Sequence, residues 1–368
     1  MVEWKKLGSL LDYEQPTAYL VKSTEYNDSF DVPVLTAGQS LLLGFTNELK
    51  GIYRADKENP TIIFDDFTTS FHWVDYDFKV KSSAMKMLRP IGGINFRYIY
   101  YAMLGINYFP TGHQRHWISK YSQFEIPIPS LSEQTRIVGI LDTFTASIDN
   151  LKEQIAERRK QYEHYRDQLL DLEGKEGVEM VAMKDLFVIR NGYTPSKNHP
   201  EYWESGTLPW FRMEDIRQNG RILSDSIQHI TPLGVKKGGL FPANSIIVAT
   251  TATIGEHALL IVDSLANQQF TFLTKCKSYD SKLNMKYMYY YMFIVDEWCK
   301  NNINVSGFAS VDMDRFKKLQ IPIPALAEQQ RIVSILDTFE ASITNLEAQL
   351  REREKQYEYY RNKLLTFE

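Results

Sequence analysis

Apolar residues follow one another at alternating steps of four and three along residues 137–169. This is the a/d seam of a coiled-coil heptad repeat, and it returns along residues 332–364. One helix cannot bury so narrow a stripe alone, and the nearest partner is the other helix of the same chain. The sequence therefore predicts a two-helix coiled coil with the seam Ile137, Leu141, Phe144, Ile148, Leu151, Ile155, Ile332, Leu336, Phe339, Ile343, Leu346 and Leu350.

The seam lies within a longer internal repeat. Residues 124–173 return 195 positions later as residues 319–368, with about 32 of 50 positions identical. A different sequence precedes each copy, so the order is variable block, repeat, variable block, repeat. A fixed spacing of this size indicates an architecture with two-fold pseudo-symmetry.

The start of each repeat predicts where its helix begins. Ile-Pro-Ile-Pro at 126–129 and 321–324 favours extended backbone, because proline fixes its own φ and moves its predecessor out of the α region. Ser130 and Glu133 then fit a capping box, whereas the second copy has Ala325 at the cap position. About 40 residues of helix follow, on the order of 60 Å.

Two arginines, Arg158 and Arg353, occupy seam positions where apolar residues are expected. In one interpretation each arginine extends its charged head to solvent past the tyrosines that follow. In the other, each arginine pairs with a glutamate of the opposing helix and sets the register, at a cost in stability.

The variable blocks combine short β-type runs with loops and a few short helices, which predicts compact α/β domains at residues 1–125 and 174–318. The repeats at 126–173 and 319–368 would supply the long spacer helices. Residues 95–104 and 284–293 resemble each other and are rich in aromatic side chains. Because aromatic residues at helical spacing more often pack in a core than stack on bases, we expect both segments to be core.

Composition narrows the functional classes. The chain of 368 residues carries a formal net charge of −4, and the acidic excess lies mainly on the repeats. A polyanion would therefore have to contact local basic patches rather than a whole-domain field. The chain opens without a signal peptide, contains no run of about 18 apolar residues and has only Cys276 and Cys299, so we expect a soluble cytoplasmic protein.

The variable blocks differ most just before the Ile-Pro-Ile-Pro segment that closes each of them. Gly112 is followed by His113, Gln114, Arg115 and His116, whereas Gly307 is followed by Phe308, Ala309 and Ser310. A divergent loop at a fixed place is typical of a specificity loop, and Gln and Arg side chains suit bidentate contacts with adenine and guanine edges. An ordinary solvated loop is the alternative.

Basic and threonine-rich segments are further candidates for nucleic-acid contact, the lysines through phosphates and the threonines in a groove. Plain solvated surface is the alternative for each. These candidates are Thr68, Thr69, Lys79, Lys81, Lys86, Lys236, Lys237, Thr251 and Thr253.

Catalytic motifs do not emerge from the sequence. It contains no glycine-rich cofactor loop, P-loop, histidine pair at metal spacing or Asn/Asp-Pro-Pro-aromatic tetrapeptide. Glu48-Leu-Lys50 has the Glu-x-Lys spacing of one nuclease core, but without an evident acidic partner it is most simply a chance match. We expect a chain that binds and positions, without a metal or cofactor of its own.

The repeated exit motif I-P-I-P-x-L-x-E-Q-x-R-I-V, together with Gly192-Tyr-Thr-Pro195 and Glu201-Tyr-Trp203 at the opening of the second block, resembles the specificity subunit of type I restriction–modification systems. The resemblance covers the whole chain, although the first block lacks a matching Gly-x-Thr-Pro. It implies an α+β fold with two α/β target recognition domains, joined by two long helices that form an antiparallel coiled coil.

The resemblance also implies a function. Each domain would read one half of a split, asymmetric site on double-stranded DNA. The implied partners are two modification subunits, which bind S-adenosylmethionine and methylate adenine, and restriction (motor-nuclease) subunits. The chain itself would be non-catalytic. The alternative is a coiled-coil adaptor whose two heads bind protein partners, which the near-neutral charge of the blocks allows.

Overall fold

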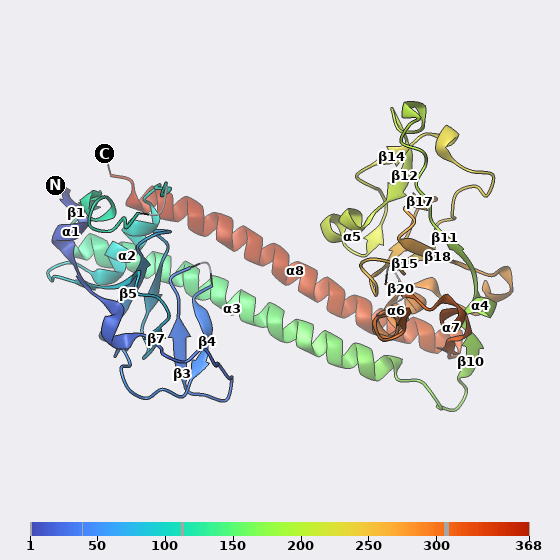
Figure 1. The fold of residues 1–368 in the computed structure, drawn as a ribbon, viewed down its shortest axis with the longest axis horizontal. Helices are drawn as coiled ribbons and strands as arrows, with labels where there is room; N and C mark the ends of the chain where they lie inside the picture. The colour runs from blue at the N-terminus through green and yellow to red at the C-terminus, as the bar shows by residue number, and fades with distance from the viewer. Residues whose placement is uncertain (1, 39, 112–113, 305–308, 368) are drawn as a thin grey trace. The chain divides into compact units, whose positions relative to one another are not determined.

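The computed structural model describes residues 2–38, 40–111, 114–304 and 309–367. The chain divides into two compact units, Met1–Glu153 with Glu347–Glu368, and Gln154–Leu346. Each unit holds one variable block and a part of both long helices, α3 (Leu131–Leu170) and α8 (Leu326–Leu365), drawn in green and red in Figure 1. The boundaries predicted between blocks and repeats stay a prediction, because the units divide the helices themselves.

The first unit contains a four-stranded antiparallel sheet and a three-stranded mixed sheet. Its elements are β1 (Glu3–Lys6), α1 (Leu7–Leu10), β2 (Leu11–Glu14), β3 (Val32–Leu35), β4 (Leu42–Thr46), β5 (Thr61–Asp65), β6 (Phe71–Val74), β7 (Lys79–Val80), β8 (Met85–Pro90), α2 (Phe96–Leu104) and β9 (Glu125–Ile128). The strand orders are β2-β8-β5-β6 and β4-β3-β7.

The second unit contains a five-stranded sheet in the order β11-β18-β15-β16-β13 and a three-stranded sheet in the order β14-β12-β17. Its elements are β10 (Glu179–Ala182), α4 (Met183–Leu186), β11 (Phe187–Asn191), β12 (Leu208–Phe211), α5 (Met213–Asn219), β13 (Ile222–Leu223), β14 (His229–Ile230), β15 (Ser245–Ala249), β16 (His257–Leu260), β17 (Leu265–Ala266), β18 (Phe270–Lys275), α6 (Met285–Asn301), β19 (Ile303–Asn304), β20 (Ser310–Val311), α7 (Met313–Lys318) and β21 (Gln320–Ile323).

Both units follow one plan, which confirms the pseudo-two-fold repeat. The Ile-Pro-Ile-Pro segments form β9 and β21, as predicted, and each pairs antiparallel with the first strand of its own block, β1 and β10. A central antiparallel pair, β5 with β8 and β15 with β18, follows the same plan.

The aromatic segments form α2 and α6 and lie in the cores, as predicted. Tyr98 and Tyr101 are buried in the first unit, and Tyr287 and Tyr290 in the second. An asparagine caps each helix, because the side chains of Asn95 and Asn284 accept hydrogen bonds from the backbone N–H groups two and three residues later.

Within each unit, α3 and α8 run antiparallel. In the first unit, the rings of Phe144 and Tyr360 stack with centroids 5.4 Å apart, and Lys152 reaches Glu354 at 3.9 Å. In the second unit, the rings of Tyr165 and Phe339 stack at 5.5 Å. Burial along the seam is uneven. The first seam residues of each helix are buried in the core of the adjoining variable block, which we call the head of its unit: Ile137, Leu141, Ile332 and Leu336. Further along, Ile148 and Ile155 of α3 are buried, whereas the other seam residues are half-buried: Phe144, Leu151, Phe339, Ile343, Leu346 and Leu350.

The seam arginines add a contact that neither sequence interpretation included. The guanidinium of Arg158 lies over the ring of Phe339, 5.9 Å from its centroid, and that of Arg353 lies over Phe144 at 5.7 Å. Each arginine thus meets the aromatic residue of the opposing helix, and a cation–π contact of this kind helps to hold the register.

Candidate nucleic-acid interface

The first predicted specificity loop presents two of its side chains to solvent. Gln114 and Arg115 are exposed, whereas His113 lies outside the described residues. His116 is buried, and its Nδ1 lies 2.9 Å from the hydroxyl of Tyr108. His116 was named among the DNA-binding candidates, and that prediction is wrong, because its ring packs inward at the end of the loop.

Asp66, which follows β5, holds the end of this loop. Its backbone carbonyl accepts the N–H of His116 at 2.8 Å, and its Oδ1 accepts the N–H of Trp117 at 2.7 Å. Its Oδ2 lies 3.1 Å from Lys86 Nζ, and both side chains are at most 2% exposed. Lys86 was predicted to contact phosphate; that prediction is wrong, because the ammonium is buried in an ion pair.

Lys79 is the second lysine that the structure removes from the phosphate candidates. Its side chain is 3% exposed, and Nζ donates to the carbonyls of Lys50 and Gly51 and lies 3.4 Å from Glu48. Burial tends to raise the pKa of Glu48, but hydrogen bonds from the N–H groups of Ser23 and Lys22, together with Lys79, outweigh burial and lower it. Glu48 is thus a structural ion-pair partner, which fits the chance reading of its Glu-x-Lys spacing.

The remaining candidates of the first unit differ in exposure. Lys81 is exposed, with Nζ 5.7 Å from the centre of the Tyr26 ring. Thr68 is exposed and its hydroxyl bonds that of Ser70, whereas Thr69 is buried with a φ of 58° and donates to the carbonyl of Thr68. Thr68 stays a candidate contact, while the Thr69 hydroxyl is already used inside the turn.

In the second unit, the turn that holds Thr250 and Thr251 lies beside Ser310 and Val311. Thr251 and Ser310 form an isolated β-bridge, and the carbonyl of Thr250 accepts the N–H of Val311 at 2.9 Å. Thr251 and Ser310 are half-buried, as is Thr253, whose Oγ1 is buried without a partner in the described residues. Phe308 lies outside the described residues.

Sequence reasoning missed a group of amide side chains that lie near Thr250, where β15 ends. The turn Asn267–Gln269 joins β17 to β18, and the carbonyl of Gln269 accepts the N–H of Thr250. Gln268 is exposed, and its Oε1 accepts the hydroxyl of Thr194 at 2.5 Å. The exposed Asn191 accepts the hydroxyl of Thr271. The run of three amide residues, Asn267-Gln268-Gln269, between two short β-type segments could have indicated this group from the sequence.

The lysines of the 236–239 turn remain free to meet an anion. Lys236 and Lys237 are both exposed. Lys236 Nζ lies 4.3 Å from the centre of the Tyr193 ring, and Arg190 donates to the carbonyl of Gly238 at 3.2 Å. This turn therefore stays a candidate for phosphate contact.

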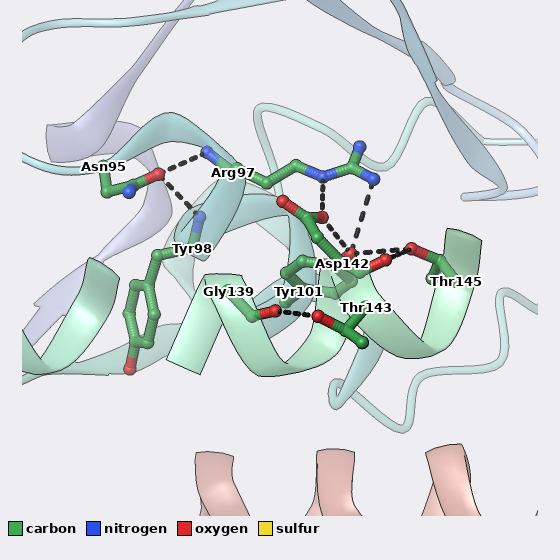
Figure 2. Close-up of polar contacts among 8 residues, drawn as sticks. All are labelled: Asn95, Arg97, Tyr98, Tyr101, Gly139, Asp142, Thr143 and Thr145. Atoms are coloured by element: carbon green, nitrogen blue, oxygen red, sulfur yellow. Dashed lines mark hydrogen bonds and ion pairs between the residues drawn. The ribbon is translucent and has the colours of Figure 1, made fainter. Parts of the chain in front are cut away.

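Each head is fixed to its repeat helix by a matching polar network. In the first unit, the Tyr101 hydroxyl donates to Asp142 Oδ1 at 2.5 Å, and Arg97 Nε donates to the same oxygen at 2.9 Å (Figure 2). In the second unit, Tyr290 donates to Asp337 at 2.5 Å. Burial and the bond to the carboxylate raise the pKa of both tyrosines, so both stay protonated donors.

The glutamine of each exit motif completes the network. Gln329 accepts the N–H of Asn284 and donates to the carbonyls of Pro324 and Lys282, all at 2.8 Å. Gln134 accepts the N–H of Asn95 at 2.9 Å and donates to the carbonyl of Pro129 at 2.8 Å. The capping box at Ser130 is half confirmed: Ser130 accepts the N–H of Glu133, whose carboxylate bonds Arg136 instead.

Among the described residues, no group of three or more His, Cys, Asp or Glu side chains could hold a metal ion. In the same part of the chain, every helix is too short or too polar to cross a membrane.

Comparison with known proteins places these features in a family. Residues 1–158 and 175–354 match the family model of the type I restriction modification DNA specificity domain. The chain is 42% identical to the specificity subunit of the type I restriction enzyme EcoR124I/EcoR124II of Escherichia coli, over 100% of this chain and 94% of the relative. The EcoprrI specificity subunit of the same organism is 50% identical over 55% of this chain and 53% of its own length.

A solved structure shares the fold across the whole chain. The S subunit of a type I restriction–modification system from M. genitalium superposes with a TM-score of 0.62, at 14% identity, covering 100% of this chain and 97% of that one. At this low identity the likeness shows the α+β fold with its long helix pair and no more.

Proposed function

Because the chain belongs to the type I restriction modification DNA specificity family, we propose that it recognises DNA sequence for such a system, with each head reading one half of a bipartite site. One observation supports two different half-sites. The units share a plan, yet Gln114 and Arg115 of the first loop have no counterpart in the Ala309–Ser310 segment of the second. Different reading loops on equivalent scaffolds favour an asymmetric target.

The charge distribution supports local contacts. With a formal net charge of −4, binding has to rely on patches such as Lys236 and Lys237. Binding-site selection with the assembled complex is the test, and we expect one split, non-palindromic motif. Affinity for that duplex should fall steeply with salt, because neutralised phosphates release counterions. A complex that selects no sequence and binds DNA without salt dependence would instead support the adaptor with protein-binding heads.

We extend the proposal to the partners. Most exposed positions of a helix change freely, so identity between the two repeats at exposed positions calls for a reason other than folding. Leu131 and Leu326 are such a pair, with exposed fractions of 59% and 37%. Thr143 and Thr338, and Ala146 and Ala341, are further exposed identical pairs. A partner that binds the same face twice supplies the reason, which supports two copies of a modification subunit per chain.

The partner proposal is tested by counting subunits. Ala146→Arg or Ala341→Arg should each reduce the assembly from two modification subunits to one, and the double variant should bind none, as measured by native mass spectrometry. Gln168→Lys is the matched control, because Gln168 is exposed and the second repeat already carries lysine at that position, Lys363. An unchanged stoichiometry in the double variant would contradict the proposal that the modification subunits bind at Ala146 and Ala341. Purified alone, the chain should neither methylate nor cut DNA.

A further inference from the structure

In each head, two buried polar side chains lie at the end of the central strand pair, at equivalent positions. The two heads use different residue types there. In the first head, β5 and β8 pair Phe64 with Lys86, and Asp66 lies two residues further on. In the second head, β15 and β18 pair Val248 with Thr271, and Thr250 lies two residues further on. Asp66 with Lys86 thus corresponds to Thr250 with Thr271, whose buried hydroxyls lie 2.8 Å apart.

The fold itself does not require the charged version. Two buried hydroxyls hold the same strand ends together in the second head, whereas a buried ion pair carries a desolvation cost that its attraction often fails to exceed. The backbone carbonyl of Asp66 accepts the N–H of His116, just as the carbonyl of Thr250 accepts the N–H of Val311 in the second head. The carboxylate adds a bond that the threonine pair lacks, because Asp66 Oδ1 also accepts the N–H of Trp117.

These two bonds act on the residues immediately after Arg115. Trp117 is also fixed from the other side, because its ring packs edge-on against Phe64 with centroids 5.0 Å apart. Lys86 holds the carboxylate in place through its other oxygen. The backbone that leaves the loop is therefore set by a buried charge pair that does not itself reach solvent.

We propose that Asp66 and Lys86 are positioning residues for DNA recognition: the buried pair fixes the Gln114–Arg115 loop so that its side chains can meet base edges of the first half-site. The inference rests on the proposed function and deepens it. A long side chain on a loose loop loses entropy on binding, and rigid support from a second layer of residues lowers that cost.

The test is binding-site selection on the full complex with two matched double variants. D66A/K86M removes both charges and the acceptor for Trp117 N–H without leaving a buried unpaired charge. D66N/K86Q is neutral too, but it keeps the hydrogen bonds. The asparagine oxygen introduced at position 66 can still accept from Trp117 N–H, while the glutamine oxygen at position 86 accepts from the asparagine amide. T250V/T271V is the control in the second head.

For D66A/K86M we expect discrimination at one or more base pairs of the first half-site to fall about tenfold or more, with the second half-site unchanged. D66N/K86Q should restore most of it, and T250V/T271V should leave the first half-site unchanged. If D66A/K86M fails to assemble, Lys86→Gln alone, which keeps a donor beside the carboxylate, should weaken the same base pairs to a smaller degree.

Two results would overturn the inference alone: an unchanged first half-site motif in both D66A/K86M and Lys86→Gln, or an equal loss at both half-sites that follows the melting temperature. A wild-type complex that selects no motif would overturn the proposed function, and this inference with it.

Discussion

Gln329 offers a direct test of how the second head is fixed to its repeat helix. The side chain is fully buried and makes three hydrogen bonds, two as donor and one as acceptor, all to backbone groups. Gln329→Ala would leave the N–H of Asn284 and the carbonyls of Pro324 and Lys282 without these partners. Asn284 also caps α6, so the loss falls where the head meets the helix.

The magnitude follows from the number of bonds. A buried polar group left without its partner costs about 1–3 kcal/mol. Partial relaxation and entry of water reduce the sum of three, so we expect a loss of about 3–5 kcal/mol in the free energy of unfolding. Gln134 makes two equivalent bonds, and Gln134→Ala should cost about 2–4 kcal/mol. The neighbouring Gln330 is exposed, and Gln330→Ala should stay within ~0.5 kcal/mol of wild type.

Equilibrium urea unfolding of the full chain, followed by circular dichroism, measures these differences. Hydrogen exchange then locates them: the amides at the start of α6 should exchange faster in Gln329→Ala, and those at the start of α2 in Gln134→Ala. If Gln329→Ala and Gln330→Ala unfold at the same urea concentration with the same slope, the three bonds do not hold the head to the helix. A uniform rise in exchange across the second unit would also contradict the local account.

Three further predictions follow from the loop, the fragment and the tyrosines. If Arg115 reads a guanine, Arg115→Ala should cost ~1–3 kcal/mol of binding free energy and relax specificity at one base pair of the first half-site. If Arg115 contacts a phosphate, the variant should bind all sequences more weakly by the same factor, and its salt slope should fall by about one. Binding-site selection distinguishes the two outcomes. Residues 1–173 expressed alone should form a homodimer and select a palindrome of the first half-site, because α3 then lacks its partner stretch of α8; sedimentation of a stable monomer would contradict this. Tyr290→Phe should destabilise the chain by about 1.5–3 kcal/mol, since its hydroxyl donates to the charged Asp337, and the exposed Tyr359→Phe is the control.

The heptad period, the repeated exit motif and the paired prolines were enough to predict the long helices, the extended strands before them and the two equivalent units. These signals are local or periodic, so they can be read without knowing which residues meet in space. The aromatic segments were assigned to the core for the same reason, because their spacing matches one face of a helix. The family resemblance supplied the ligand class, which neither the near-neutral charge nor the period could provide.

The lysines show what a local pattern cannot decide. Lys79, Lys81 and Lys86 look alike in sequence, yet only Lys81 is exposed. Whether a lysine meets solvent depends on a carboxylate far along the chain, Glu48 for Lys79 and Asp66 for Lys86. The same holds for Gln329, which lies 45 residues from the backbone N–H that it accepts. Periodicity along one segment determined the helices and strands; the pairing of distant segments, which alone decides burial and hydrogen-bond partners, determined which polar residues are left to face a ligand.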